Sequence, residues 1–192
     1  MDVRELIINN RSYRRFYGDH PIDLSTLYEL TDLARLSASA RNDQPLKYIL
    51  SCDPNTNEKI FSTVAWAGFL KEWNGPVKEE QPVAYIVMLH DINVSAKIDC
   101  DHGIAAQSIL LGAVEKGLGG CILGSVKKDM IREKLTIDPA FEILQVIALG
   151  KPKENVVLDS VRDKGDTKYW RDNKDIHHVP KRELEDIIVA TY

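Results

Sequence analysis

The sequence predicts an α+β protein in which one sheet is layered against helices, and three features support this class. Apolar runs of strand length are interspersed with longer segments of helical spacing. These two kinds of segment do not alternate regularly, as a parallel βαβ fold requires. No Gly-x-Gly-x-x-Gly motif follows the first strand, which argues against a doubly wound dinucleotide-binding fold. Because 192 residues suffice for one full core but are few for two, we expect a single domain over residues 1–192.

Charge and cysteine content narrow the class further. The net charge is −4, whereas proteins that bind duplex nucleic acid usually carry a basic face, so nucleic acid is not an expected partner. The cysteines Cys52, Cys100 and Cys121 are odd in number and form no Cys-x-x-Cys pair, which indicates a reducing compartment. The N-terminus has no apolar signal-peptide core, and no apolar run has the length of a membrane span. We therefore expect a cytoplasmic protein without membrane contact.

Two helices are expected before the first strand. Residues 2–10 place their apolar side chains on one face of a short helix. Asp23 stands at the N-cap of a longer helix over residues 24–40, in which leucines recur at helical spacing and the opposite side is polar. Residues 45–52 then have the composition of a strand.

The next stretch is expected to contain a turn, a helical region and a buried strand. The Asp-Pro-Asn-Thr-Asn sequence of residues 53–57 indicates a turn, and residues 58–73 have helical character before a Gly-Pro break. The aromatic residues between Trp66 and Trp73 are interpreted either as core or as a cover over a substrate site, where they could stack on planar molecules. Residues 82–90 form a continuous apolar run of strand length.

The second half is expected to hold a buried helix and further strands. Apolar residues cover nearly every face of segment 101–119, so we expect this helix to be buried on most sides, centrally or at a subunit interface. Residues 119–125 and 141–150 are typical of buried strands, and Ser125 is placed to cap a helix between them. The last 40 residues are charged and loop-like up to a candidate terminal strand at residues 186–190. We expect this tail to wrap a second copy of the chain.

Positive charge is concentrated in the sequence Asn-Arg-Ser-Tyr-Arg-Arg-Phe of residues 10–16. The planar guanidinium groups of Arg11 and Arg14 suit a phosphate, because each can donate two parallel hydrogen bonds, and Ser12 adds a hydroxyl donor. These residues can converge on one ligand if the backbone here is irregular. The alternative is a helix C-terminus, where cations interact favourably with the helix dipole.

Three other segments offer groups for a flat, phosphorylated ligand. Asn42 and Gln44 carry amides that can read the edge of a polar ring, although turn chemistry accounts for the same residues. Four glycines in residues 117–126 would let the backbone approach a ligand closely, but they also make tight turns. Lys181 and Arg182 offer two more cations for a phosphate, which carries nearly two charges, or they belong to a solvated loop.

Other chemistries have little support. The segments Asp99–His102 and His177–His178 offer imidazoles and carboxylates, but neither has a spacing such as His-Glu-x-x-His, so we expect no metal site. There is no Gly-x-Ser-x-Gly motif, and no serine or cysteine is marked by its neighbours as an activated nucleophile. We therefore expect no hydrolase triad.

In this order, the segments resemble the nitroreductase family of flavin enzymes. The resemblance rests on Arg-Ser-Tyr-Arg-Arg-Phe at residues 11–16, Ala-Arg-Leu-Ser-Ala-Ser-Ala-Arg-Asn-Asp-Gln-Pro at 34–45, the segment 101–125, Ala-Leu-Gly-Lys-Pro at 148–152 and Val-Pro-Lys-Arg-Glu-Leu at 179–184. It covers nearly the whole chain. It implies an α+β fold with a mainly antiparallel central sheet, a homodimer, and two FMN sites at the subunit interface.

The resemblance also implies which residues bind FMN. Arg11, Ser12 and Arg14 would contact its phosphate, ribityl chain and pyrimidine edge, with Arg14 supporting negative charge on the reduced flavin. The other implied contacts are Ser39, Asn42 and Gln44 from the partner subunit, Ile122, Leu123, Gly124 and Ser125 along the ring face and its N5 edge, and Lys181 and Arg182 at the phosphate.

Three positions depart from the family pattern. The proline that usually precedes Ser39 is Ala38 here. A frequent tryptophan after Pro45 is Leu46, and Asn10 stands where an arginine is common. The phosphate ligands are retained, whereas contacts to the ring and the space for substrate would differ.

The chemistry that the resemblance implies is a ping-pong reaction in which NADH or NADPH reduces a small organic acceptor, such as a nitroaromatic or a quinone. The flavin carries this reaction, so no catalytic acid, base or nucleophile is expected in the chain. Two other functions stay open at this point. One is a flavin-binding carrier or sensor without efficient turnover, and the other is a non-flavin module that binds a phosphorylated metabolite or a protein partner.

Overall fold

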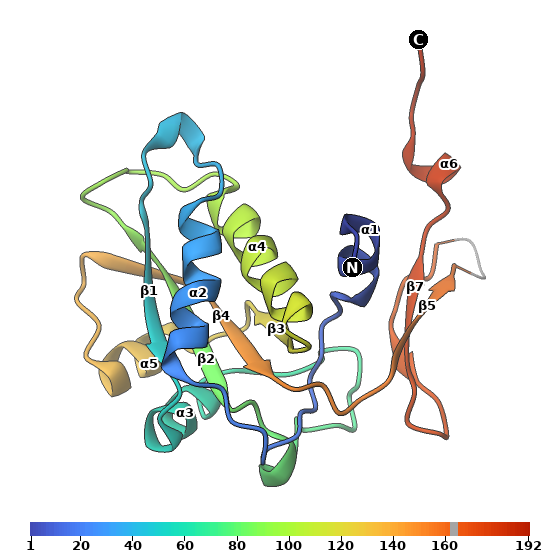
Figure 1. Ribbon diagram of the computed structural model, residues 1–192, viewed down its shortest axis with the longest axis horizontal. Helices are drawn as coiled ribbons and strands as arrows, with labels where there is room; N and C mark the ends of the chain where they lie inside the picture. Colours follow the sequence, from blue (N-terminus) through green and yellow to red (C-terminus); the bar gives the residue numbers. More distant parts are fainter. Residues whose placement is uncertain (162–164) are drawn as a thin grey trace. The chain divides into compact units, whose positions relative to one another are not determined.

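The computed structural model describes residues 1–161 and 165–192. The helices are α1 (Val3–Asn9), α2 (Leu24–Arg35), α3 (Pro54–Phe61), α4 (Asp101–Glu115), α5 (Lys128–Leu135) and α6 (Leu184–Ile187), and the short 3-10 turns are η1 (Ala40–Asn42) and η2 (Lys78–Glu80) (Figure 1). The strands are β1 (Leu46–Ser51), β2 (Ala84–Asp91), β3 (Gly119–Leu123), β4 (Phe141–Gly150), β5 (Val156–Ser160), β6 (Trp170–Arg171) and β7 (His177–Lys181).

The chain divides into two compact units. The larger unit comprises Met1–Trp66 and Gly75–Lys153, and the smaller comprises Ala67–Asn74 and Glu154–Tyr192. Each unit has a sheet of its own, β1 to β4 in the larger and β5 to β7 in the smaller. That the two units act together as one domain stays a prediction.

The larger unit is built on an antiparallel sheet with the strand order β1-β2-β4-β3. The central strands β2 and β4 are continuous apolar runs and are buried along most of their length, because helices cover both of their faces. At one edge, β3 pairs with β4 from Gly119 opposite Gly150 to Leu123 opposite Val146. The α+β class and the mainly antiparallel sheet expected from the sequence are confirmed.

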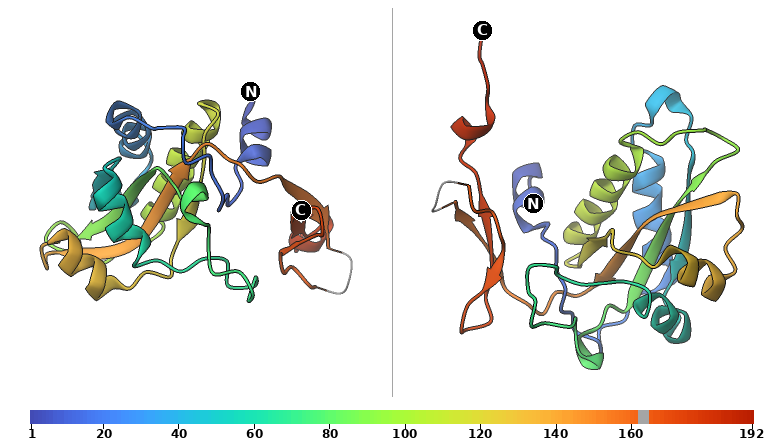
Figure 2. Two further views of the ribbon diagram at one scale, coloured as in Figure 1. Left: turned by 90° about the horizontal axis from the view of Figure 1, so that it is seen from below. Right: turned by 180° about the vertical axis from the view of Figure 1, so that it is seen from behind.

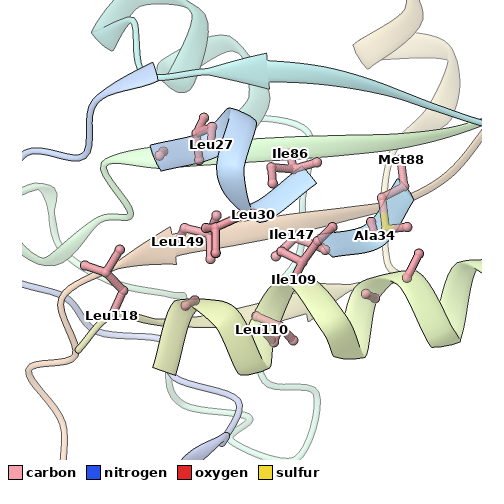
Figure 3. Close-up of a cluster of buried hydrophobic side chains, with 14 of the residues drawn as sticks. Leu27, Leu30, Ala34, Ile86, Met88, Ile109, Leu110, Leu118, Ile147 and Leu149 are labelled. Carbon is pink, nitrogen blue, oxygen red and sulfur yellow. The ribbon is translucent and has the colours of Figure 1, made fainter. Parts of the chain in front are cut away.

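Helices cover the two faces of this sheet because successive side chains of a strand point to opposite sides (Figure 2). On one face, Leu30 of α2 and Ile109 of α4 meet Ile147 of β4, and all three are fully buried (Figure 3). On the other face, Ile131 of α5 packs in the cluster around Tyr85 of β2. With α1, α2 and the sheet packed around it, α4 is covered on most sides, as expected.

Two local structures around α3 differ from the prediction. Residues 53–57 begin α3 rather than form a turn: the Asp53 carboxylate accepts a hydrogen bond from the Thr56 N–H at 2.8 Å, and Pro54 occupies the first turn. The helix also ends at Phe61, and residues 67–74 belong to the smaller unit instead of extending it. An Asp-Pro sequence therefore starts this helix, where we expected it to end a strand.

The predicted cap of α5 is wrong as well. α5 begins at Lys128 with Lys127 at the N-cap position, and no side chain caps its first turn. The carbonyl of Ser125 instead accepts a hydrogen bond from the Ala65 N–H at 3.0 Å. Ser125 therefore belongs to an extended segment beside residues 64–65, two residues too early for the helix.

The smaller unit contains short strands that the sequence analysis missed. β5 runs parallel to β7, and β6 runs antiparallel to it. Residues 67–74 join this unit through aromatic contacts: the rings of Phe69 and Tyr169 lie 5.1 Å apart, and the Arg171 guanidinium lies 4.4 Å from the Trp73 ring. The predicted terminal strand is wrong, because residues 184–187 form α6 and the chain then ends without regular structure.

Candidate functional site

Residues 11–18 form an irregular, extended segment tied to other parts of the larger unit. The Tyr13 N–H donates to the Gly120 carbonyl of β3 at 3.0 Å, and the residue before Tyr13 forms a parallel bridge with the same glycine. Further along, the Phe16 N–H donates to the Glu80 carbonyl at 3.0 Å. The segment therefore has the irregular backbone that a converging ligand set requires, and it lies beside β3.

Arg11 and Arg14 have different surroundings within this segment. Arg14 is only 8% exposed, and its Nη1 donates to the Ser12 carbonyl at 3.1 Å. Arg11 is half-buried, and its Nη2 donates to the Ile7 carbonyl at 2.6 Å, so it also closes the C-terminal end of α1. Within the described residues, the buried Nε of Arg11 has no hydrogen-bond partner, and burial lowers the pKa of this guanidinium.

Arg15, in contrast, forms a structural ion pair. Its Nε lies 2.5 Å from Oε2 of Glu80 and its Nη2 lies 2.9 Å from Oε1, a bidentate pair. The Lys153 ammonium lies 3.0 Å from the same carboxylate. The hydrogen bond from Arg15, with a smaller contribution from Lys153, lowers the pKa of Glu80 to about 2.

The far end of β3 is open. Ile122 lies on the same side of the strand as Gly120 and is 41% exposed, and Ser125 is exposed as well. A Cβ added to Gly124 would meet no atom within 4 Å. Leu123 points to the other side, is 4% exposed, and belongs to the core, so its backbone is the part that a ligand could contact.

The segment after α2 folds over the beginning of α4. Asp101 accepts a hydrogen bond from the Ser39 hydroxyl at 2.5 Å and from the Ala40 N–H at 3.0 Å. The Ser39 hydroxyl in turn accepts from the Gln44 N–H at 2.9 Å. These bonds close residues 39–44 into a compact loop held by one buried carboxylate.

The backbone of this loop is unusual. Arg41, Asn42 and Gln44 have φ angles of 52°, 59° and 53°, in the left-handed region that residues other than glycine rarely occupy. The side chains of Asn42 and Gln44 are exposed, and the Gln44 Nε2 donates to the Asn42 carbonyl at 3.3 Å. The loop therefore presents two amides to the outside in a conformation that must be held in place.

Within one chain, the arginine segment and this loop do not meet. Helix α4 lies between α2 and α1 (Figure 1), and the Asn10 amide donates to Gln107 on the α1 side of α4 at 3.3 Å. The loop contacts the N-terminal end of α4 at Asp101, whereas Tyr13 contacts Gly120, beyond the C-terminal end. The arginine segment and the loop at residues 39–44, which the sequence predicts to share one site, therefore lie on different sides of the larger unit.

Lys181 and Arg182 lie in the smaller unit. Lys181 is the last residue of β7, and its carbonyl accepts a hydrogen bond from the Val161 N–H at 3.0 Å. Both cationic side chains are exposed. That they share a phosphate with Arg11 stays a prediction.

Residues 1–161 and 165–192 contain neither a candidate metal site nor a candidate membrane-spanning helix. In that part of the chain, no group of three or more His, Cys, Asp or Glu side chains could hold a metal ion. None of the helices described there combines the length and the apolar character needed to cross a membrane.

The family model described as the nitroreductase family matches residues 7–151, which include the arginine segment, the loop at residues 39–44 and β3. The chain belongs to the nitroreductase family. One relative comes from Methanothermobacter thermautotrophicus, and its name proposes an NADH dehydrogenase/NAD(P)H nitroreductase. It is 31% identical to this chain over 163 residues, and the match covers 81% of this chain and 80% of the relative. MhqN of Bacillus subtilis, whose name proposes an NAD(P)H nitroreductase, is 24% identical over 184 residues, covering 79% of this chain and 89% of its own.

Solved structures of nitroreductases share the fold. A crystal structure from Exiguobacterium sibiricum, described as a proposed nitroreductase in complex with FMN, matches with a TM-score of 0.71 at 16% identity. The match covers 85% of this chain and 94% of that one. The nitroreductase fold expected from the sequence is therefore confirmed.

One residue of the site was misjudged from the sequence. The sequence places Asp101 at the start of a buried helix, in a segment where we expect no metal site, and assigns it no role; in the structure it is the anchor of the loop at residues 39–44. The available signal was a single carboxylate at the start of an otherwise apolar helix. A carboxylate in that position is buried with the helix and must find hydrogen-bond donors.

Proposed function

We propose that this nitroreductase-family protein is an FMN-dependent oxidoreductase that passes reducing equivalents from NADH or NADPH to a small organic acceptor, such as a nitroaromatic or a quinone, by a ping-pong mechanism. The observation that carries the proposal is the docking of the arginine segment against β3. The contacts of Ser12 and Tyr13 with Gly120 place the arginine segment beside β3, and Ile122 and Gly124 lie at the exposed far end of the same strand.

The residues at this edge fit FMN, which joins a phosphate to a flat ring. Its phosphate needs cations and N–H donors, and the buried Nε of Arg11 is such a donor without a partner in the described part of the chain. Its ring needs an apolar and sterically open surface, which Ile122 and Gly124 offer. We place the ring along residues 122–125 and the phosphate near Arg11 and Ser12, with Lys181 and Arg182 as further phosphate contacts.

Bound FMN would supply the hydride chemistry, and the chain would bind it, orient it and set its electrostatics. Arg14 would stabilise negative charge on the reduced cofactor, because a buried cation acts through a lower dielectric than water. The open end of β3 would cover one face of the ring and leave the other to substrates. NAD(P)H and the acceptor would use that face in turn, which gives the ping-pong order.

A second copy of the chain would complete the site. Since α4 separates the arginine segment from residues 39–44 within one chain, Ser39, Asn42 and Gln44 would reach the flavin of the partner subunit. Exposed apolar side chains in the tail, such as Ile187 at 60% and Val189 at 100%, would be covered where the tail wraps the partner. We also propose that the two units act as one domain and that the dimer works in the cytoplasm, where its cysteines stay reduced.

The visible absorption spectrum of the purified protein tests the cofactor and the reaction together. We expect a bound-flavin spectrum after FMN addition and gel filtration, which bleaches with NADH or NADPH and recovers on addition of a quinone. Flavin that binds but does not bleach would instead indicate a carrier or sensor. A protein that retains no flavin would refute the proposed function.

The variant Arg14→Ala tests the electrostatic role. Loss of a buried, charged hydrogen-bond donor is expected to raise the dissociation constant for FMN about tenfold or more, or to slow flavin reduction by a similar factor. Arg4→Ala is the matched control, because Arg4 is exposed on α1. If Arg14→Ala matches this control in both measurements, Arg14 has no part in the mechanism.

A further inference from the structure

Asp101 is a buried carboxylate whose hydrogen bonds leave its own helix. It is the first residue of α4 and is 4% exposed. Acidic residues at helix starts usually accept from N–H groups of the same helix, but here both donors, the Ser39 hydroxyl and the Ala40 N–H, lie about sixty positions earlier in the chain. The start of a 15-residue helix also favours a negative charge. The carboxylate is thus well suited to anchor a segment from elsewhere.

The anchored loop depends on this contact. Ser39 both donates to Asp101 and accepts from the Gln44 N–H, so one hydroxyl links the carboxylate to the far end of the loop. Between these two ends, Arg41 and Asn42 have left-handed backbone conformations, as does Gln44. Such conformations persist only where surrounding contacts over-determine them.

Side-chain packing at the ends of the loop adds little to the hydrogen bonds at Asp101. A half-open pocket of about 140 Å³ lies beside the two ends of the loop and is lined by Ser39, Gln44, Tyr48 and Asp101 among others. Burial, with a smaller contribution from the negative charge of Asp101, raises the pKa of Tyr48 to about 12. Because Ser39 and Gln44, at the two ends of the loop, border this pocket, losing the hydrogen bonds at Asp101 would free the loop to move.

We propose that Asp101 is a positioning residue of the flavin site, which holds residues 39–44 in the shape that presents Asn42 and Gln44 to the FMN of the partner subunit. This inference rests on the proposed function. Asp101 does not touch the cofactor; it acts through the loop. The Ser39 hydroxyl uses its one donor hydrogen on Asp101 and accepts from the Gln44 N–H, so it holds the loop as well and keeps one lone pair for a donor on the flavin.

The test compares Asp101→Asn with wild type in the full chain. Asparagine keeps the shape but replaces one acceptor oxygen with an NH₂ group that cannot accept from Ser39 or Ala40. Asp129→Asn is the matched control, because it removes the same charge from an exposed position in the first turn of another helix, α5. Hydrogen exchange of the peptide covering residues 38–46 is measured without FMN, with the β2 peptide as an internal reference, and FMN affinity is measured by fluorescence quenching.

We expect Asp101→Asn to speed exchange in residues 39–44 at least about tenfold while the β2 peptide is unchanged, and to raise the FMN dissociation constant about tenfold. Should exchange rise in both peptides, Ser39→Ala replaces Asp101→Asn in the test. In that variant Asp101 keeps its hydrogen bond from the Ala40 N–H, but the link from the carboxylate to Gln44 is lost, so the same loop is expected to be freed. Unchanged loop exchange in both variants would overturn the proposal, as would faster loop exchange with unchanged FMN affinity. If wild type itself fails to bind FMN, the proposed function fails, and the exchange data separately decide whether Asp101 holds the loop.

Discussion

Replacing Glu80 with a neutral residue should lower the free energy of unfolding at neutral pH and make that free energy depend less on pH. The carboxylate accepts a bidentate pair from Arg15 and a further contact from Lys153, and its side chain is 11% exposed. These contacts lower the pKa of Glu80 from an ordinary 4.5 to about 2. Glu80→Gln keeps the shape of the side chain and deletes the charge, so it isolates this contribution.

The magnitude follows from the lowered pKa. A difference of about 2.5 pH units between the unfolded and folded chain corresponds to about 3 kcal/mol at neutral pH. Because Arg15 and Lys153 keep 21% and 40% of their side chains exposed, solvent screening reduces this to about 2 kcal/mol. The folded pKa is the lower one, so the stabilisation is fully present above pH 4.5 and is lost as the pH falls towards 2, with more than half gone by about pH 3.

Urea unfolding at a series of pH values measures this directly. We expect Glu80→Gln to lower the free energy of unfolding by about 2 kcal/mol at pH 7, and the difference from wild type to shrink steadily between pH 4.5 and 3. Glu79→Gln, at the exposed neighbouring position, should change both quantities little. A difference that stays constant from pH 7 to pH 3 would refute the reasoning, because it would show that Glu80 titrates normally in the folded protein.

Two further predictions concern β3 and the smaller unit. Gly120→Ala should lower the free energy of unfolding by about 2–3 kcal/mol, because its Cβ would lie 2.5 Å from the Ala148 carbonyl oxygen. In the control Gly124→Ala the new Cβ meets nothing within 4 Å, so the free energy of unfolding should stay within about 0.5 kcal/mol of wild type. Equal shifts of the melting temperature in the two variants would contradict this. His178→Gln should shift the NMR resonance of the Trp170 indole N–H, which is read separately from those of Trp66 and Trp73, and should speed proteolysis of the smaller unit, because the rings of His178 and Trp170 stack at 4.0 Å. An unchanged resonance would show that the stack does not form in solution.

The sheet and its covering helices were predictable because their signals are local and strong. Residues 82–90 and 141–150 are continuous apolar runs, and such runs must be buried between two layers. The strands of the smaller unit were not predictable in this way. β5 has no fully buried residue and no strict alternation, because Val156 and Val157 are both half-buried, and β6 is only two residues long, so neither has a clear apolar pattern. Residues 186–190, which are apolar after Asp186, indicate a strand by composition, but pairing partners rather than composition decide where a strand forms.

The candidate site shows the same division between local and long-range information. The arginine segment was found from its composition, because phosphate ligands have a recognisable chemistry. The anchor of the loop at residues 39–44 was not found, since the partners Ser39 and Asp101 are separated by 62 positions and a lone carboxylate carries no motif. Such a contact becomes visible only when the fold brings the end of α2 to the start of α4.

The three neighbouring arginines show how the fold and the site depend on each other. Arg11 closes the end of α1, and Arg15 is fixed by its ion pair with Glu80. Arg14 lies between them and is the most buried of the three. The backbone on one side of Arg14 is held at Gly120, and on the other it is held by the Phe16 N–H at the Glu80 carbonyl. A cluster of like charges can therefore persist on this acidic protein because Arg15 is paired with a carboxylate and Arg11 is held at a backbone carbonyl. These contacts fix the place of Arg14, which we assign to the flavin together with Arg11.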